Sequence, residues 1–378
     1  QAQARADVAE LAAAVRGLTT AGIAALTTDG IKALTTAQAA ALSTAQVAAI
    51  ETADIAAMDT ADLAALSVTQ VAALGTAQLD ALGTLQLAHL TNAQLAALST
   101  NQLAVLTGAD LSALSSSQIA ALTVNQIASL STAQISTLET ADLAALTTAQ
   151  VRALSTDNIV ALDSAQIGAL STAQVAALTT TQVQALETAD LVVMESADLR
   201  AFTSTQIAAL TTDQIDALET AQIGQLTNAQ VAAITTNQLA TFDTQELGAL
   251  STVQFQALTT AQVVSLSDEQ VTGLSTDAIA ALTTAQAHVL TADQILALTT
   301  DQVQALETAD LSAMTMTQYN AFEGEDWAAM STAQFAALQS VTPIMLDLNG
   351  DGIKTLAAAD GVSFDLTGLG KAEQVGWA

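Results

Sequence analysis

The feature that most constrains this chain is a repeat of eight residues that runs unbroken through most of its length. From Leu18 to Leu338 every eighth residue is large and apolar, which gives 41 such positions, and 32 of them are leucine. The repeated octad is Ser/Thr/Glu/Asp-Thr-x-Gln-Val/Ile/Leu-Ala-Ala-Leu, as in residues 171–178, and we number its positions p1 to p8. A period this strict predicts a repeat architecture in which neighbouring units stack and bury a common core.

The period of eight argues against one long helix. Eight residues of α-helix turn through about 800°, some 80° beyond two full turns, so the leucine stripe would wander around the helix. A coiled coil needs a period near ~3.5 or ~3.67 residues, and a period of about 4.0 fits neither. A strand is also disfavoured, because the apolar positions p5 and p8 are three residues apart and do not alternate. We therefore expect a short helix that restarts in every octad.

Start signals at p1 and p4 place that helix. Position p1 is Ser, Thr, Asp or Gly in 33 of the 40 octads, and these residues are good N-caps. Position p4 is Gln, Asp or Glu in 36 octads, which completes a capping box, and p5 is apolar in all 40, which forms a hydrophobic staple with the preceding p8. Because such short helices are unstable alone, they must pack on one another.

We therefore predict an all-α solenoid of about 40 octapeptide repeats, each a short capped helix. Positions p5 and p8 are expected inside and positions p1 to p4 near the surface. These patterns leave the handedness of the solenoid and the number of octads per turn open.

The chain is expected to have three segments. Residues 1–17 are alanine-rich and indicate an amphipathic helix, and residues 18–338 hold the octads. Residues 339–378 break the pattern, contain the single proline, Pro343, and are rich in Gly and Asp with short β-like runs such as Val362 to Phe364. Proline holds the residue before it in extended conformations, so it marks a boundary.

Composition excludes several classes of function. The 37 acidic and seven basic residues give a net charge of -30, which opposes binding to nucleic acid or to anionic lipid. No apolar run approaches the ~18–20 residues that span a bilayer, so we expect no membrane insertion. Without cysteine there are no disulfides or thiolate sites. Residues 1–5 lack the features of a secretory signal peptide.

One motif in the C-terminal segment indicates a metal site. Asp347, Asn349 and Asp351 place oxygen ligands at positions 1, 3 and 5 of a loop with glycine at position 6, as in the first half of a calcium loop. The carbonyl of Ile353 would supply position 7. Position 12 is alanine where an EF-hand has glutamate, and Asp360 could close a modified site instead. The alternative is a glycine turn that binds no metal.

The same segment resembles a known family. Residues 342–353, 361–365 and 374–377 are similar to a segment near the C-termini of large secreted bacterial repeat proteins of the haemolysin-type calcium-binding, repeats-in-toxin or adhesin-like kind. The resemblance covers about a tenth of the chain. The glycine-rich nonapeptides of the toxin β-rolls are absent, and Leu369 stands where a second loop would have an acidic ligand. The resemblance implies calcium as cofactor, extracellular surroundings and export without an N-terminal signal peptide.

Nothing in the octads indicates catalysis. His89 and His288 occupy p7 and p6 of distant octads, so no shared site is expected. Capping accounts for the many Ser, Thr and Asp residues, and no phosphate loop or His-Glu zinc motif occurs. We therefore expect that the protein is not an enzyme.

Acidic residues pair within some octads. Seven octads begin with Glu, and six of these carry Asp at p4. A local explanation is that Thr at p2 takes over as cap while Asp stabilises the first helical turn. The alternative is that cations bridge neighbouring acidic octads.

The uniform octads predict a structural or adhesive repeat protein in which the solenoid is a stalk, spacer or fibre, and the resemblance implies that it is extracellular, at a bacterial cell surface. A uniform unit without insertions favours regular length over a single binding pocket. The alternative is a self-assembling subunit of a surface layer, sheath or filament, because open solenoid ends can associate head to tail. The sequence identifies no cell-surface partner.

Overall fold

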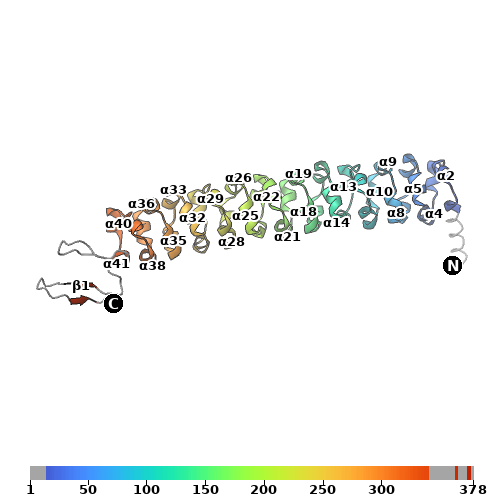
Figure 1. The fold of residues 1–378 in the computed structure, drawn as a ribbon. Coiled ribbons are helices and arrows are strands. Elements are labelled where there is room, and N and C mark those ends of the chain that lie inside the picture. Colours follow the sequence, from blue (N-terminus) through green and yellow to red (C-terminus); the bar gives the residue numbers. More distant parts are fainter. Residues whose placement is uncertain (1–13, 340–361, 365–372, 376–378) are drawn as a thin grey trace, which may run out of the picture. The chain divides into compact units, whose positions relative to one another are not determined.

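The computed structural model describes residues 14–339, 362–364 and 373–375 (Figure 1). The chain divides into two compact units, one ending at Ala281 and the other beginning at Leu282. Among the described residues 40 α-helices, α2 to α41, follow one another at the octad period. The prediction of one short helix in every octad is confirmed.

Within unit 1, which ends at Ala281, nearly every helix that has a partner three octads further along the chain packs against it. Three octads therefore form one turn of the solenoid, and the helices stack into three faces. Face 1 holds α2 (Thr20–Ala24), α5 (Thr44–Ala48), α8 (Val68–Ala72), α11 (Asn92–Ala96), α14 (Ser116–Ala121), α17 (Thr140–Ala145), α20 (Ser164–Gly168), α23 (Thr188–Val193), α26 (Thr212–Asp216), α29 (Thr236–Leu239) and α32 (Thr260–Ser265). Face 2 holds α3 (Thr28–Lys32), α6 (Thr52–Ile55), α9 (Thr76–Asp80), α12 (Thr100–Leu103), α15 (Val124–Ala128), α18 (Thr148–Ala153), α21 (Thr172–Ala177), α24 (Ser196–Ala201), α27 (Thr220–Ile223), α30 (Thr244–Gly248) and α33 (Asp268–Thr272). Face 3 holds α4 (Thr36–Ala41), α7 (Thr60–Ala65), α10 (Thr84–Ala88), α13 (Gly108–Ser112), α16 (Thr132–Ile135), α19 (Thr156–Val160), α22 (Thr180–Ala185), α25 (Ser204–Ala209), α28 (Asn228–Ala233), α31 (Thr252–Gln256) and α34 (Thr276–Ala280).

Unit 2, which begins at Leu282, repeats the same packing, since α35 contacts α38 and α38 contacts α41. Its helices are α35 (Thr284–Val289), α36 (Ala292–Leu296), α37 (Thr300–Ala305), α38 (Thr308–Ala313), α39 (Met316–Tyr319), α40 (Gly324–Ala329) and α41 (Thr332–Gln339). Two strands follow, β1 (Val362–Phe364) and β2 (Glu373–Val375), which pair antiparallel with Ser363 opposite Gln374.

The ends of each helix follow from the octad. In α21 the Ser171 hydroxyl accepts the Gln174 N–H, and the Gln174 side chain accepts the Ser171 N–H at 2.7 Å, so the predicted capping box is formed. Leu178 then adopts an extended conformation (φ -55°, ψ 141°), which ends the helix and leads into the next N-cap. One octad thus contains both the start and the stop signal of its helix.

The core confirms one prediction about burial and corrects another. Positions p5 and p8 are buried as expected: Val175 is 0% and Leu178 5% exposed. The expectation that p4 lies near the surface is wrong, because Gln174 is only 2% exposed and p4 is buried in most octads. A polar side chain at this depth needs hydrogen-bond partners, which lie in the adjacent turn of the solenoid.

In unit 2 larger rings occupy the core positions. The Trp327 ring lies 5.0 Å from the Tyr319 ring and 5.9 and 5.8 Å from the rings of Phe322 and Phe335, measured between ring centroids. Phe322 is buried, whereas Phe335, in the last described helix, is 38% exposed.

Candidate functional site

The metal ligands predicted from the sequence lie outside the described residues. These are Asp347, Asn349, Asp351, Ile353 and Asp360. The predicted helix over residues 1–17 is described only from residue 14, and residues 14–16 are helical. Within the described part of the chain, no group of three or more His, Asp or Glu side chains is placed to hold a metal ion.

The most regular polar structure in the described octads is a seam of buried glutamines at p4. In unit 1 the side-chain amide of every p4 glutamine from Gln46 to Gln270 donates to the carbonyl 28 residues earlier, at 2.6–3.2 Å. For Gln174 the acceptor is the p8 carbonyl of Leu146, at 2.7 Å, and the same Nε2 donates to Leu143 at 2.8 Å. We call this row of glutamines the glutamine seam.

The glutamine seam satisfies two helix ends at once. A short helix leaves unpaired N–H groups at its start and unpaired carbonyls at its end. The Oε1 of Gln174 accepts the N-cap N–H of its own helix, while its Nε2 donates to carbonyls at the end of a helix in the preceding turn. One amide supplies both the acceptor and the donor that these ends require.

Where p4 is Gly, Asn or Ala, the side chain makes fewer hydrogen bonds to the preceding turn, or none. Gly22 and Gly30 occupy p4 of the first two octads and carry no side chain that could donate to an earlier turn. Asn158 has a shorter amide and reaches only the Leu130 carbonyl, at 3.1 Å. Ala278 offers no hydrogen-bonding group.

Acidic residues at p4 form a second kind of junction in the seam. A carboxylate accepts the N-cap N–H but has no donor for the carbonyls of the preceding turn. In three octads a carboxylate oxygen instead accepts a hydrogen bond from the hydroxyl at p2 of the helix three octads earlier. The pairs are Thr28 with Asp54, Ser116 with Asp142 and Ser164 with Asp190, each at 2.8 Å.

Three further p4 aspartates have buried side chains without any hydrogen-bond partner among the described residues. They are Asp62, Asp198 and Asp310, which are 3%, 8% and 2% exposed. Oδ2 of Asp310 is fully enclosed and unpaired. Burial raises the pKa of all three carboxyls, and the nearby acidic N-cap residue raises each pKa further; these neighbours are Asp59, Glu195 and Glu307, in that order. The pKa of Asp310 is raised to about 6.

From the sequence, Asp198 and Asp310 were singled out only through their pairing with Glu at p1, and Asp62, whose p1 residue is Asp59, was not singled out. The side chains of Glu195 and Glu307 do not cap their helices. The local explanation, in which Thr at p2 takes over as cap, stays a prediction. The sequence did contain a signal, which is the replacement of the usual p4 glutamine by aspartate. The buried p4 position requires a hydrogen-bond donor, and an ionised aspartate can only accept.

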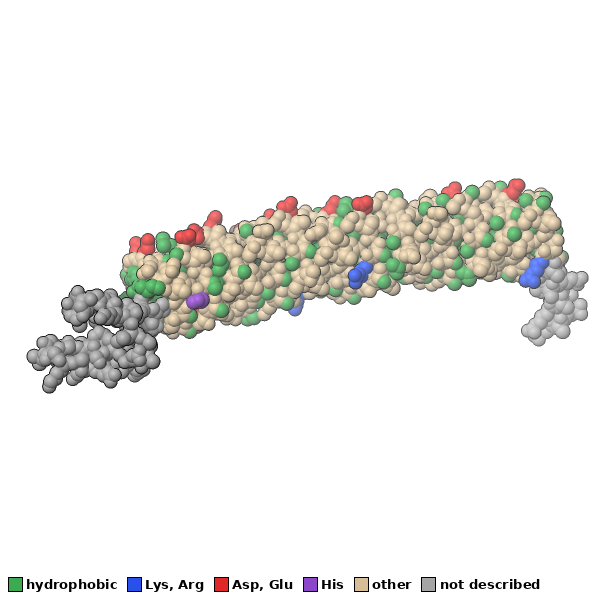
Figure 2. Space-filling view, viewed as in Figure 1, with side chains coloured by type: hydrophobic (Ala, Val, Ile, Leu, Met, Phe, Trp, Pro, Cys, Tyr) green, Lys and Arg blue, Asp and Glu red, His purple; other side chains and the backbone are tan. Residues whose placement is uncertain are grey.

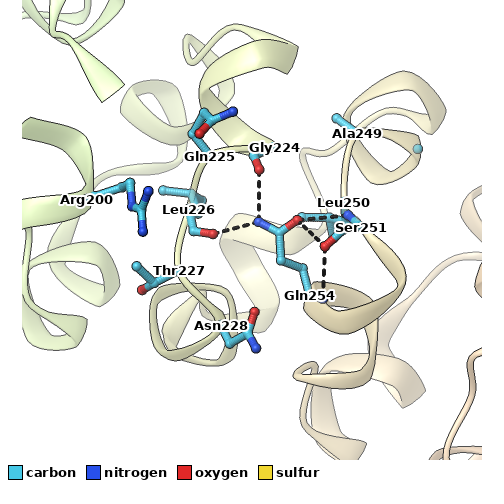
Figure 3. A pocket seen from close by; sticks show the side chains of 11 residues that line it. Arg200, Gly224, Gln225, Leu226, Thr227, Asn228, Ala249, Leu250, Ser251 and Gln254 are labelled. Atoms are coloured by element: carbon cyan, nitrogen blue, oxygen red, sulfur yellow. Dashed lines mark hydrogen bonds between the residues drawn. The ribbon is translucent and has the colours of Figure 1, made fainter. Parts of the chain in front are cut away.

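A polar groove of about 590 Å³ lies where α27 and α30 end (Figure 3). Arg200 lies at one side of it, and the Gln254 amide donates to the carbonyls of Gly224 (3.1 Å) and Leu226 (2.6 Å) within it. A Cβ at Gly224 would lie 3.0 Å from the Ala249 carbonyl oxygen, so successive turns approach closely here. The groove is lined by no acidic side chain and no histidine, so it offers no acid–base pair for catalysis. Its polar groups and Arg200 suit hydrogen bonding and the recognition of a charged group.

The two histidine side chains are exposed. Nδ1 of His89 is 2.7 Å from the Leu85 carbonyl oxygen, and Nδ1 of His288 is 2.6 Å from that of Ala313. Each therefore contacts a backbone carbonyl. No helix among the described residues is long and apolar enough to cross a bilayer.

Each unit is thus a tandem-repeat helical solenoid with three octads per turn. The ALTTAQ repeat family matches the chain in segments that together cover well over half of it, and the chain belongs to this family. The matched segments are residues 6–44, 47–84, 55–92, 106–138, 135–172, 161–188, 191–228, 231–268, 240–276, 279–308 and 303–340. No curated protein matches the chain.

Proposed function

We propose that this protein is an extracellular structural or adhesive repeat protein in which the octad solenoid acts as a stalk, spacer or fibre. The observation that supports this most is the glutamine seam. It recurs at the same step from Gln46 to Gln270 and fastens each turn of unit 1 to the preceding one. A structure whose stabilising bonds recur at a constant step along the chain provides length and regularity.

The role of the hydroxyl groups supports a function without catalysis. Ser171 and the equivalent Ser or Thr residues at p1 accept a backbone N–H as N-caps, so their oxygens stabilise helices. Removing one complete turn, residues 147–170, tests the spacer role. The variant is expected to shorten the particle by one turn in electron micrographs and to keep its circular dichroism per residue. Loss of helicity throughout would contradict a modular spacer.

We propose calcium as the ligand of the C-terminal segment. The carboxylates of Asp347 and Asp351, the amide oxygen of Asn349 and the carbonyl of Ile353 are hard oxygen ligands, and Asp360 would complete the set. Extracellular calcium is abundant enough to fill even a site of millimolar affinity. Isothermal titration with calcium should release heat in the wild type and not in Asp347→Ala/Asp351→Ala. Equal heats from both proteins would leave the loop as a glycine turn.

Location is tested separately. Protease added to intact producing cells should remove the solenoid if the protein is exported to the cell surface. Protection until the cells are lysed would contradict an extracellular role.

The second candidate function is a self-assembling subunit of a surface layer, sheath or filament. The exposed Phe335 ring at p5 of α41 favours it, because the p5 residues of unit 1 are buried. Electron microscopy of the purified protein separates the two: regular polymers favour assembly, and isolated particles favour the stalk.

A further inference from the structure

The few basic residues of the octads share one position. In the octads there are three, Lys32, Arg152 and Arg200, and all three occupy p6 of a face 2 helix (α3, α18 and α24). They are separated by five and by two complete turns of the solenoid. All three side chains are exposed, and none forms an ion pair among the described residues. We call this row the basic edge.

The path of the chain places the basic edge beside face 3. Each face 2 helix ends where a face 3 helix begins, and each face 3 helix ends where a face 1 helix begins. Arg152 at the end of α18 is thus followed by α19 on face 3 and then by Asp163, the N-cap of α20. Face 3 therefore lies between the C-terminal ends of face 2 and the N-caps of face 1.

The opposite border of face 3 is acidic. The N-caps of three successive face 1 helices, α17, α20 and α23, are Glu139, Asp163 and Glu187. Glu139 and Glu187 make no side-chain cap, are exposed, and lie two turns apart, as Arg152 and Arg200 do. We call this row the acidic edge. In Figure 2 acidic side chains gather along one border of unit 1, and basic side chains lie on another.

Face 3 carries fewer charged residues than the other two faces, and it also has exposed apolar side chains. Over residues 19–281 the octads of face 3 contain five acidic residues, against seven on face 1 and eleven on face 2. Three of the four most exposed large apolar side chains of unit 1 lie on face 3: Leu85 (66%), Val253 (57%) and Val160 (50%). In a chain of net charge -30, this face is where two copies repel each other least.

We propose that face 3 of unit 1 is an interface through which two copies of this chain pair side by side and in parallel. Two copies that run in the same direction and face each other are related by rotation about that direction, so the basic edge of one meets the acidic edge of the other. An antiparallel pair would bring like edges together. The inference goes beyond the proposed function and holds wherever the protein is located.

The strength of such a pair comes from several weak contacts. One exposed ion pair contributes little, so the two edges act together with the apolar side chains between them. At an ionic strength of about 0.15 M the Debye length is about 8 Å, which screens the repulsion between distant acids but leaves contacts across the edges effective. The experiment is therefore made at this ionic strength.

The absence of cysteine from the sequence permits a direct test with the full chain. Leu85→Cys and Val253→Cys each place one thiol on face 3, seven turns apart, and a short bismaleimide crosslinks thiols that lie close together. A parallel pair predicts covalent dimers from each variant alone. An antiparallel pair predicts dimers only when the two variants are mixed, which would overturn the proposal, as would no dimers at all. Val193→Cys on face 1 is the control for random collision.

The role of the edges is tested by sedimentation equilibrium. Arg152→Gln/Arg200→Gln should weaken association roughly tenfold or more, since two ion pairs are lost at each edge. Asn101→Asp/Asn125→Asp on face 2 lowers the net charge by the same two units away from face 3 and should leave association close to that of the wild type. Equal weakening by both variants would mean that total charge, and not the basic edge, controls association.

Discussion

Gln174 and Asp198 occupy the same position of adjacent turns on face 2, and they show what the seam requires. Gln174 accepts its N-cap N–H and donates to two carbonyls of the preceding turn. Asp198 is also buried, but its side chain makes no hydrogen bond among the described residues, and its burial raises its pKa. Both residues stand at N3 of a face 2 helix, so the difference in side chain accounts for the loss of hydrogen bonds at this one position.

The comparison shows two kinds of contact between turns at p4. A glutamine stabilises the contact at every pH, whereas the stability of a contact made by an aspartate depends on whether its carboxyl group is protonated. Glutamine supplies a donor and an acceptor at every pH. An aspartate supplies a donor only when it is protonated, and it then offers the same two functions as an amide. At Asp190 the Ser164 hydroxyl replaces the missing donor. Thr172 occupies the equivalent position relative to Asp198, but no hydrogen bond joins these two side chains among the described residues.

The largest expected effect comes from breaking a glutamine junction. Gln174→Leu removes three hydrogen bonds to the backbone and leaves a buried N–H and two buried carbonyl groups without this partner, which should destabilise the surrounding turns by about 4 kcal/mol. Native-state hydrogen exchange of the amides in α21 measures this locally, because repeat arrays open by region. Gln184→Leu at an exposed p6 position is the control and should change stability by less than about 0.5 kcal/mol. Similar losses in the two variants would contradict the role of the seam.

The next effect is a pH dependence at Asp310. Its pKa is raised from 3.8 to about 6 in the folded chain, so the folded state binds the proton more tightly than the unfolded state does. The resulting stability is fully present below pH 3.8 and is lost as pH rises through about 6. The loss between these limits is on the order of 3 kcal/mol.

Carboxyl NMR titration and urea unfolding between pH 4 and 8 measure this effect. Asp310→Asn should remove this part of the pH dependence and stabilise α38 at pH 8, because the amide stays neutral. The prediction fails if the variant and the wild type lose stability in parallel over this range.

The smallest effect is expected at a junction that a hydroxyl completes. Ser164→Ala removes the 2.8 Å hydrogen bond to the buried Asp190 carboxylate and should cost about 1.5–2 kcal/mol, as bonds to charged groups do. Ser196 occupies the same position of α24 and has a glutamine above it, so Ser196→Ala should cost less than about 0.5 kcal/mol. Thermal unfolding measures the loss of stability in the two variants. Equal losses would contradict the claim that the Ser164 hydroxyl completes the contact at Asp190.

Local patterns predicted the helices well, because their signals lie within a single octad. The N-cap at Ser171, the box with Gln174 and the staple of Leu170 with Val175 are all contained in one octad and its border. The three-octad turn could not be derived in this way. It depends on the angle between successive helices, and the octads are too similar to show a longer period.

Two features of the sequence do reflect the turn once it is known. Gly22 and Gly30 omit the seam side chain in the octads where the stack starts, and the basic residues of the octads recur only after whole turns. The burial of p4 was mispredicted because a capping box needs only the Oε1 of glutamine and is complete within one octad. The Nε2 of the same side chain has its acceptors in the preceding turn, 28 residues away for Gln174.

The central claim is that residues three octads apart are neighbours in space. Pairs of spin labels on introduced cysteines test it: Ala144 with Ala120 spans three octads on face 1, while Ala144 with Ala128 spans two and Ala144 with Ser136 spans one. Stacked helices lie about 8–10 Å apart, so dipolar broadening of the electron paramagnetic resonance spectrum should be strongest for the pair with the largest separation in sequence. Broadening that decreases steadily as the separation grows from one octad to three would contradict the three-octad turn and the seam that depends on it.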